Sequence, residues 1–214
     1  KMAEELTGVR AFVNALRVQN HEYNNKLHTI AGLIQLGNHE KALQFVFQTT
    51  EEQEELIQFL SKNIRDESIA GLLLSKIRRG TELGISVEID RNSQFNRFPD
   101  RLDHHDFVLI LGNLIENAFD SFKHYQGPFP HIFISIEQDA EILTLLVEDN
   151  GSGIKAADYP RIFEQGFSTK GGHERGIGLY LVNQLVQQAK GTIMAESAEG
   201  AGTSFTVTFY MEEI

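Results

Sequence analysis

The sequence predicts an α+β protein in which a helical hairpin precedes helices packed on one face of a mainly antiparallel sheet. Two observations support this fold class. Over roughly the first sixty residues, apolar side chains recur at the spacing of amphipathic helices. Beyond Asn63, helical runs alternate with short strands that form hairpins. Such runs of helices and hairpins are typical of a layer of helices on an antiparallel sheet.

The N-terminal region, residues 1–63, is expected to contain two amphipathic helices joined at Gly37-Asn38, where a glycine stops one helix and an asparagine starts the next. Seven residues per two turns is the spacing of a seam buried against a partner helix. Two helices make a thin core, so we expect two hairpins to pair into a four-helix bundle and make a homodimer. The apolar positions are Leu6, Val9, Val13, Leu16, Leu27, Ile30 and Ile34 in the first helix, and Leu43, Val46, Ile57 and Leu60 in the second.

The remaining residues, 64–214, are expected to form one α/β layer. Alternation of apolar and polar residues marks the strands, and the 3.6-residue period marks the helices. The last four strands are expected to pair as two hairpins, each joined by a polar or glycine turn. Expected helices cover residues 69–83, 101–124 and 176–190, and expected strands cover 85–90, 131–137, 142–149, 191–197 and 203–210.

The composition excludes several classes of function. Thirty acidic residues against 19 basic ones give a net charge of -11, which argues against nonspecific binding to nucleic acid or an anionic membrane. The chain has no cysteine, so disulfides, thiolate chemistry and cysteine zinc sites are excluded. Because the chain opens inside a helical pattern, we expect it to be part of a longer chain, and we expect any attachment to a membrane to be made only through other segments.

One predicted helix carries a polar face that suits a metal ion bound with phosphates. In NLIENAFDS, residues 113–121, the side chains of Asn113, Asn117 and Asp120 lie within about 60° of one another at ~100° per residue, with Glu116 beside them. Amide and carboxylate oxygens of this kind suit magnesium. A single such residue would be read as solvated helix surface, but four in register, without Lys or Arg among them, favour a site. The opposite face is apolar and contains Phe107, Leu111, Ile115, Ala118 and Phe122.

Two glycine-containing segments follow this helix. In VEDNGSGI an apolar strand ends at Asp149, and two glycines then permit a tight turn and a close approach of the backbone to a ligand. In residues 167–182 four glycines lead into a helix, whose first backbone N–H groups favour phosphate. A dinucleotide-binding reading fails, because the preceding strand and the full GxGxxG pattern are missing.

Taken in order, these motifs resemble the asparagine box, glycine boxes and phenylalanine box of the Bergerat-fold (GHKL) ATPases. The resemblance covers residues from about 63 to the C-terminus. It implies that 64–214 form a catalytic ATP-binding domain with an α/β sandwich fold. The residues that carry it are Asn113 and Asn117, Asp149, Gly151 and Gly153, Phe163 and Phe167, Gly176 and Gly178, and Gly202-Thr203.

For the phosphate side of the nucleotide, the resemblance implies that Asn117 binds Mg²⁺ and that Asn113 and Lys170 lie near the phosphates. Gly176 and Gly178 would flank the phosphates. ATP and Mg²⁺ are therefore the expected cofactors.

For the base, the resemblance implies that Asp149 accepts the amino group of adenine and that Thr203 supports it. Gly151 and Gly153 would admit the base. The segment between residues 163 and 176 would be a mobile lid, in which Arg175 directly precedes the second glycine box.

A histidine near the start of the chain completes the functional hypothesis. His21 sits beside the apolar seam of the first helix, where an imidazole would be exposed and nucleophilic near pH 7. Glu22 could orient the ring or take its proton. Asn25, one turn further on, could position a water molecule. A lone helical histidine is usually only a surface residue, and His28, His39, His104 and His105 have no better claim to a role.

The HExxN string resembles the dimerisation and phosphoacceptor helices of sensor histidine kinases. The longer NHEYNNKLHTIAGLIQLG resembles more narrowly the citrate and C4-dicarboxylate sensor kinases. This resemblance implies an autophosphorylating protein-histidine kinase that passes phosphoryl from His21 to an aspartate of a response regulator, with possible phosphatase activity toward that partner. Two alternatives remain: a clamp-type ATPase with Glu116 as general base, and a phosphotransfer scaffold that no longer binds nucleotide.

Overall fold

The computed structural model describes residues 24–123, 125–167 and 177–211, except for the side chains of residues 44 and 47–53. Its contacts divide the chain into two compact units, Lys1–Ile57 and Gln58–Ile214. Each unit has its own architecture. The division falls within one long helix, α2, His39–Asn63.

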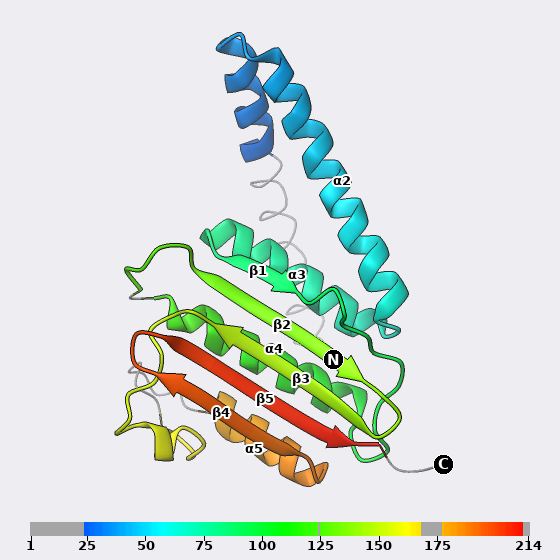
Figure 1. The fold of residues 1–214 in the computed structure, drawn as a ribbon, viewed down its shortest axis with the longest axis vertical. Coiled ribbons are helices and arrows are strands. Elements are labelled where there is room, and N and C mark those ends of the chain that lie inside the picture. The colour runs from blue at the N-terminus through cyan, green and yellow to red at the C-terminus, as the bar shows by residue number, and fades with distance from the viewer. Residues whose placement is uncertain (1–23, 124, 168–176, 212–214) are drawn as a thin grey trace, which may run out of the picture. The chain divides into compact units, whose positions relative to one another are not determined.

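In the first unit, residues 24–35 are helical and α2 follows after a tight turn (Figure 1). Gly37 has a φ of 74°, a left-handed conformation that glycine adopts without strain. The carbonyl of Asn38 accepts the first hydrogen bond of α2, from the backbone N–H of Ala42 at 3.0 Å. The predicted stop and start at Gly37-Asn38 is therefore confirmed. Several large apolar side chains of this unit are exposed: Leu27 (44%), Ile34 (48%), Leu43 (57%), Val46 (39%) and Ile57 (42%).

The second unit contains a five-stranded sheet in the order β1-β2-β3-β5-β4. Only β1 and β2 are parallel, and the other three pairs are antiparallel, as expected. The two predicted hairpins are β2 with β3 and β4 with β5. The strands are β1 Ser86–Ile89, β2 His131–Gln138, β3 Ile142–Asp149, β4 Thr192–Ala198 and β5 Gly202–Tyr210.

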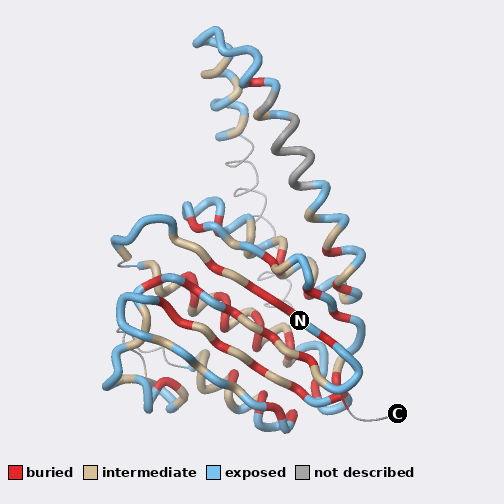
Figure 2. Tube along the Cα trace, in the orientation of Figure 1, coloured by how far each residue is buried: buried red, intermediate tan, exposed pale blue. Residues whose placement is uncertain are grey.

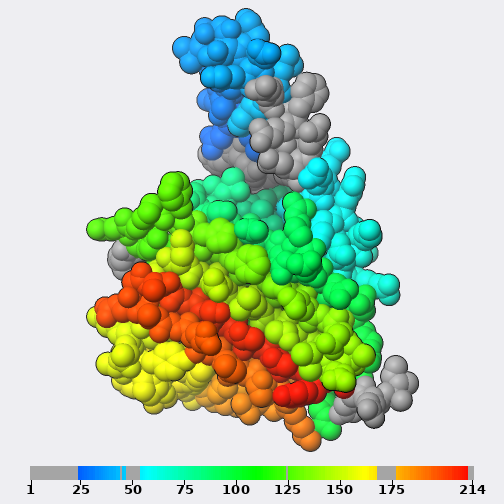
Figure 3. Space-filling model, in the orientation of Figure 1, coloured from blue at the N-terminus to red at the C-terminus, as the bar shows by residue number. Residues whose placement is uncertain are grey.

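Three helices cover one face of this sheet, α3 Glu67–Leu83, α4 His104–Ser121 and α5 Gly178–Gln188 (Figure 1). The core lies between α4 and the central strands, where buried residues alternate along β3 and β5 (Figure 2). Figure 3 looks onto the other face, which no helix among the described residues of this unit covers. The buried residues of α4 are Phe107, Ile110, Leu111, Leu114, Ile115, Ala118 and Phe119.

Capping residues explain where the helices differ from the predicted bounds. The Asp66 side chain accepts hydrogen bonds from the backbone N–H groups of Ser68 and Ile69, so α3 begins two residues before the predicted start. Asp103 caps α4 in the same way, so that helix begins at His104 rather than at residue 101. Phe122, predicted on the apolar face, is instead the C-cap residue and is only half-buried.

Candidate functional site

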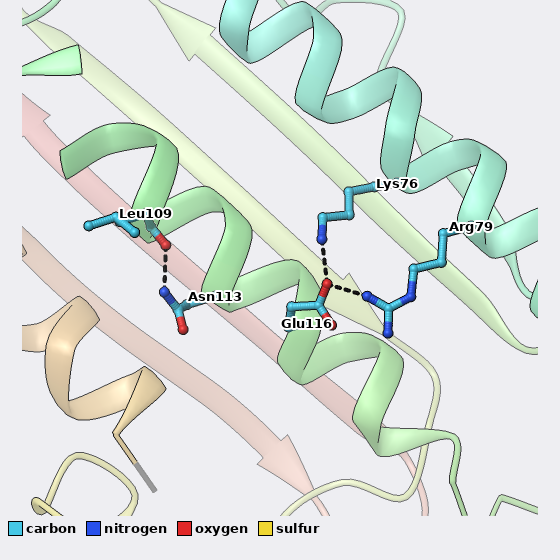
Figure 4. A network of polar contacts seen from close by, with 5 residues as sticks. All are labelled: Lys76, Arg79, Leu109, Asn113 and Glu116. Carbon is cyan, nitrogen blue, oxygen red and sulfur yellow. Dashed lines mark hydrogen bonds and ion pairs between the residues drawn. The ribbon is translucent and has the colours of Figure 1, made fainter. Parts of the chain in front are cut away.

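Asn113 lies on the side of α4 that faces α5 (Figure 4). Its Nδ2 donates to the backbone carbonyl of Leu109 at 2.8 Å, which fixes the orientation of the amide. A Cβ placed on Gly178 would lie 2.9 Å from Asn113 Oδ1, so the glycine allows the start of α5 to approach this amide closely. No side-chain hydrogen bond caps α5 in the part of the chain that the structure describes. Uncapped N–H groups of a helix N-terminus favour an anion such as phosphate.

Asn117, one turn further along α4, has an unmet hydrogen-bonding requirement. Its Nδ2 is buried and has no acceptor among the described residues. A buried polar group left unpaired costs about 1–3 kcal/mol, so such a group in a folded protein calls for a partner. The amide oxygen of Asn117 would fit magnesium as a ligand. Magnesium is commonly held by one or two protein groups together with phosphate oxygens.

Glu116 faces the opposite way, toward α3 (Figure 4). Its Oε1 accepts hydrogen bonds from Lys76 Nζ and Arg79 Nη1, both on α3. Burial raises the pKa of Glu116, but the two ion pairs outweigh this effect and leave the pKa below its ordinary value of 4.5. The four polar groups predicted on this helix contain no Lys or Arg, but the sequence did not predict that α3 brings two cations to Glu116.

Asp120, the other carboxylate of this face, forms an ion pair with Lys123 at 2.6 Å, one turn further along the chain. Both carboxylates of the α4 polar face are thus neutralised by cations. The local balance is two negative charges against three positive ones, although the whole chain carries a net charge of -11. Glu116 and its two partners lie on the side of α4 that faces α3, away from Asn113, so this balance does not describe the predicted phosphate side (Figure 4).

The carboxylate of Asp149, at the end of β3, is nearly buried, with 6% of the residue exposed. Its Oδ1 accepts a hydrogen bond from Ser121 Oγ at 2.8 Å and another from the backbone N–H of Gly151 at 2.9 Å. Ser121 is the last residue of α4, so this contact brings the end of α4 and the end of β3 together. A buried carboxylate fixed by two donors is suited to recognising a hydrogen-bond donor of a ligand.

Gly153 and Gly202 permit close backbone contacts beside Asp149. Gly153 has a φ of 66°, and a Cβ there would overlap the carbonyl oxygen of Ala198. Gly202 has a φ of 96°, and a Cβ there would overlap the carbonyl oxygen of Asp149. Packing within the chain therefore requires both glycines, because the loop after β3 lies directly against the turn between β4 and β5.

Thr203 pairs with Asp149 across β3 and β5, so these two predicted site residues are neighbours. The Thr203 hydroxyl oxygen lies 3.0 Å from Ser197 Oγ. Ser197 Oγ also accepts from the backbone N–H of Ile154 at 2.8 Å and lies 2.8 Å from the carbonyl oxygen of Gly202, to which it can donate. Ser197 therefore ties the loop after β3 to the β4–β5 turn. Sequence reasoning missed it.

Aromatic residues anchor residues 159–167, which follow the loop after β3. The ring of Phe163 lies 6.5 Å from that of Phe205 on β5, and the guanidinium of Arg161 lies 4.6 Å from the centre of the Phe167 ring. The hydroxyl of Tyr159, in the short 3-10 helix Tyr159–Arg161, donates to the backbone carbonyl of Ala195 on β4. Phe163 is thus attached to β5 and the short helix to β4, whereas Phe167 contacts Arg161 of that short helix.

The remaining predicted residues divide into two groups. His21, Glu22, Lys170 and Gly176 lie outside the described residues. Asn25 is exposed on the helix of residues 24–35, and its backbone carbonyl accepts from Thr29 Oγ1 at 3.0 Å.

In the second unit the structure brings together three parts of the predicted site: the asparagine face of α4, the start of α5, and the glycine-bearing loops around Asp149. This combination of an asparagine-bearing helix and glycine loops on a five-stranded sheet defines the class as a nucleotide-binding domain of the Bergerat type. Comparison with known proteins agrees. Residues 102–213 match the family model of histidine kinase-, DNA gyrase B-, and HSP90-like ATPases, and the chain belongs to this family of ATP-binding domains.

Residues 2–62 match the model of the alpha-helical domain of SpoOB-type sensor kinases. A probable C4-dicarboxylate sensor kinase of Bacillus subtilis is 57% identical over 212 residues, which are 99% of this chain and 40% of the relative. The sensor histidine kinase CitA of Klebsiella pneumoniae is 36% identical over 204 residues, 95% of this chain and 37% of CitA. The chain thus spans about two fifths of the length of these curated relatives.

Among solved structures, a mycobacterial sensor histidine kinase, MprB, superposes with a TM-score of 0.53 at 21% identity, covering 69% of this chain and 96% of that one. This likeness supports the fold. None of the helices in the described ranges has the length and apolar character needed to cross a membrane.

Proposed function

We propose that this chain is the core of an ATP-dependent protein-histidine kinase of a two-component system, with residues 1–63 as the dimerisation and phosphoacceptor domain and 64–214 as the catalytic ATP-binding domain. One observation carries the proposal. The asparagine face of α4 and the buried Asp149 occur in a domain of the ATPase family, and the HExxN string precedes that domain in the same chain. The relatives named as sensor kinases share both parts.

In the nucleotide domain, Asp149 would accept a hydrogen bond from the adenine amino group, supported by Thr203. Asn117 would hold Mg²⁺ together with the phosphates, and its unpaired Nδ2 supports contact with a ligand. Magnesium would supply charge neutralisation for phosphoryl transfer. Asn113 would lie beside the phosphates, close to the start of α5. We assign Lys170 and Gly176 to the phosphate side on the family resemblance alone, and Asp120 on its place in the polar helix face that the sequence predicts.

In the helical hairpin, a ring nitrogen of His21 would attack the γ-phosphorus of ATP. A nitrogen–phosphorus bond forms as the bond to the bridging oxygen of ADP breaks, and the proton of the attacking ring passes to Glu22 or to solvent. The phosphoryl group would then pass to an aspartate of a response-regulator receiver domain. Asn25 would position water for removal of the phosphoryl group. Its exposed position on the helix leaves it accessible to a partner.

We further propose that two copies pair through their hairpins. The support is that several large apolar side chains of the first unit are exposed, among them Ile34, Leu43 and Ile57. Apolar residues at the heptad spacing of a helix seam are typical of a face that packs against partner helices. By analogy with its named relatives, the whole protein would be a membrane sensor with this chain on the cytoplasmic side, and its signal would be a citrate-like or C4-dicarboxylate anion.

The geometry disfavours a clamp-type ATPase with Glu116 as general base. The carboxylate is held by Lys76 and Arg79, and its pKa is lowered, both of which weaken it as a base. The orientation of Glu116 toward α3, away from Asn113, also disfavours this role (Figure 4).

The test is incubation with γ-labelled ATP and magnesium, followed by acid and base treatment of the labelled protein. We expect label on the protein that is lost in acid and survives base, as for phosphohistidine. His21→Gln should abolish the label and leave ATP affinity nearly unchanged, whereas His28→Gln, a change of the same kind seven residues further on, should retain the label. Stable label on His21→Gln would contradict the assignment. Phosphate release without any phosphoprotein would instead support the ATPase.

A further inference from the structure

We propose that Ser121 is a positioning residue that sets the base selectivity of the nucleotide site by fixing the carboxylate of Asp149. The inference rests on the proposed function, because it assumes that Asp149 recognises the base. Ser121 was not among the residues predicted from sequence or from the family resemblance.

The first observation is that two elements hold the same carboxylate oxygen. Ser121 Oγ, at the end of α4, lies 2.8 Å from Asp149 Oδ1, and the backbone N–H of Gly151 lies 2.9 Å from it. Rotation of the carboxylate about its Cβ–Cγ bond would lengthen both hydrogen bonds. With Oδ1 fixed in this way, the direction of Oδ2 is fixed as well.

The second observation is that the Ser121 hydroxyl lies between two acceptors. Its oxygen is 2.8 Å from the Ala118 carbonyl, one turn earlier in α4, and 2.8 Å from Asp149 Oδ1. A hydroxyl has one hydrogen, so the two acceptors share it. Ser121 therefore links the end of the asparagine-bearing helix to the residue that would contact the base.

The third observation concerns Gly151, which the family resemblance assigns to admitting the base. A Cβ at Gly151 would overlap Ser121 Oγ and lie 2.7 Å from Ser121 Cβ. The space that a side chain at 151 would need is therefore filled by the serine. In this chain, the absence of a side chain at Gly151 makes room for the hydroxyl that holds Asp149.

These contacts have a consequence for selectivity. The 6-amino group of adenine donates a hydrogen bond, whereas the 6-oxo group of hypoxanthine accepts one and is repelled by a carboxylate. A fixed carboxylate discriminates strongly between the two bases, because a mismatched polar group is left unpaired. A carboxylate that can rotate will accommodate both bases better, so loss of the hydroxyl should reduce the discrimination.

The experiment measures the dissociation constants of ATP and ITP, in magnesium, for the whole 214-residue chain and its variants. The readout is the ratio of the ITP constant to the ATP constant. Ser121→Ala should lower this ratio by about fivefold, the size expected for one hydrogen bond. Ser121→Cys keeps the volume but donates weakly, and should lower the ratio to a similar extent if the alanine variant does not fold.

The matched control is Ser135→Ala. Ser135 Oγ also donates to a carboxylate oxygen, Asp90 Oδ2 at 3.1 Å, at a position on β2 that belongs to no part of the proposed site. This change should lower thermal stability by a comparable amount and leave the selectivity ratio as in the parent chain. A fall in the ratio for Ser135→Ala equal to that for Ser121→Ala would overturn the inference, since it would show a general effect of lost stability.

A second pair of variants tests the role of Gly151. Gly151→Ala should displace the serine and lower the ratio as Ser121→Ala does, and adding Ser121→Gly should restore stability without restoring the ratio. Suppose that the parent chain prefers ATP to ITP. If the ratio of the two dissociation constants is then unchanged in Gly151→Ala or in Ser121→Ala, the inference is overturned and the proposed function stands. A parent chain that does not bind ATP in preference to ITP overturns the base-recognising role of Asp149 itself.

Discussion

The helical hairpin and the sheet unit use apolar residues in similar patterns, but the structure buries them to different extents. In the sheet unit, Leu114 and Ile134 are fully buried between helix and strand. In the hairpin, Leu43 and Ile34 lie about half exposed, at 57% and 48%. The sheet unit therefore completes its own core, whereas the hairpin has an apolar surface that a second copy would cover.

The difference shows that an apolar stripe alone does not tell whether its partner lies in the same chain. In the sheet unit the partner surface is the sheet, which three helices cover on one side (Figure 1). In the hairpin, two helices have too little surface to bury both of their stripes. The two regions should respond differently to substitution, and their responses should depend differently on protein concentration.

The largest effect on stability is expected from Leu114→Ala, in the centre of α4. The side chain is fully buried, so the change should lower the free energy of unfolding by about 2–5 kcal/mol through lost burial and the cavity left behind. Denaturant unfolding checks this. The loss should not vary with protein concentration, and a loss that shrinks as concentration rises would show that this core depends on a second copy.

A somewhat smaller effect is expected from Asp149→Asn, which tests whether the sheet unit binds nucleotide by itself. Replacing the carboxylate acceptor should weaken ATP binding by about 10- to 100-fold, the value of a hydrogen bond to a charged group. Calorimetric titration with ATP measures it. Thr144→Ala, on the same strand, is the control and should bind ATP like the parent chain. Unchanged affinity in Asp149→Asn would remove the role of Asp149 with adenine.

The next effect concerns the hairpin. Leu43 is exposed in the single chain and would be buried in the proposed dimer. Leu43→Glu puts a charge at this position, so it should weaken dimerisation by roughly tenfold or more for each leucine that the dimer no longer buries. Sedimentation at several concentrations measures the equilibrium, and the melting of the sheet unit should be unchanged. Glu55→Gln, an exposed polar change on the same helix, serves as control. Equal dimerisation of the Leu43 variant and its parent would place the interface elsewhere.

The smallest effect is expected from Glu116→Gln, which removes the charge that ties α4 to α3. Because the folded-state pKa of Glu116 is below its ordinary value of 4.5, its contribution to stability is complete above that pH and is lost as pH falls through the folded pKa. The side chain is partly exposed, so the variant should lose only about 0.5 kcal/mol near neutral pH. Its stability should also fall less on acidification below about pH 4.5 than that of the parent. If the free energy of unfolding of Glu116→Gln and that of the parent chain fell equally as the pH is lowered, the stabilising role of the ion pairs would be contradicted.

Much of the fold follows from periodicity and turn chemistry. The sheet unit's helices and hairpins were predicted within three residues. The errors at the starts of α3 and α4 lie where Asp66 and Asp103 cap a helix, and α4 and α5 also end before the predicted residues. Periodicity within one helix does not reveal what another helix brings to it. For this reason the partners of Glu116, which lie 37 and 40 residues earlier in the chain, were not predicted.

The candidate site was predicted in part. The positions of Asn113 and Asp149 were found because their motifs are local. Ser121 could have been found as well, since it follows Asn117 by four residues and shares its helix face. The packing roles of Gly153 and Gly202 could not, because each depends on backbone contact with a segment distant in sequence.

The contact between Tyr159 and Ala195 has a consequence for solubility. Among the described strands, β4 lies at the edge of the sheet and pairs with β5 alone, so its outer side could recruit a strand from another molecule. The tyrosine hydroxyl already occupies one carbonyl of that strand. The short helix that carries Tyr159 therefore shields part of this edge, and we expect it to hinder pairing of β4 with a strand from another molecule.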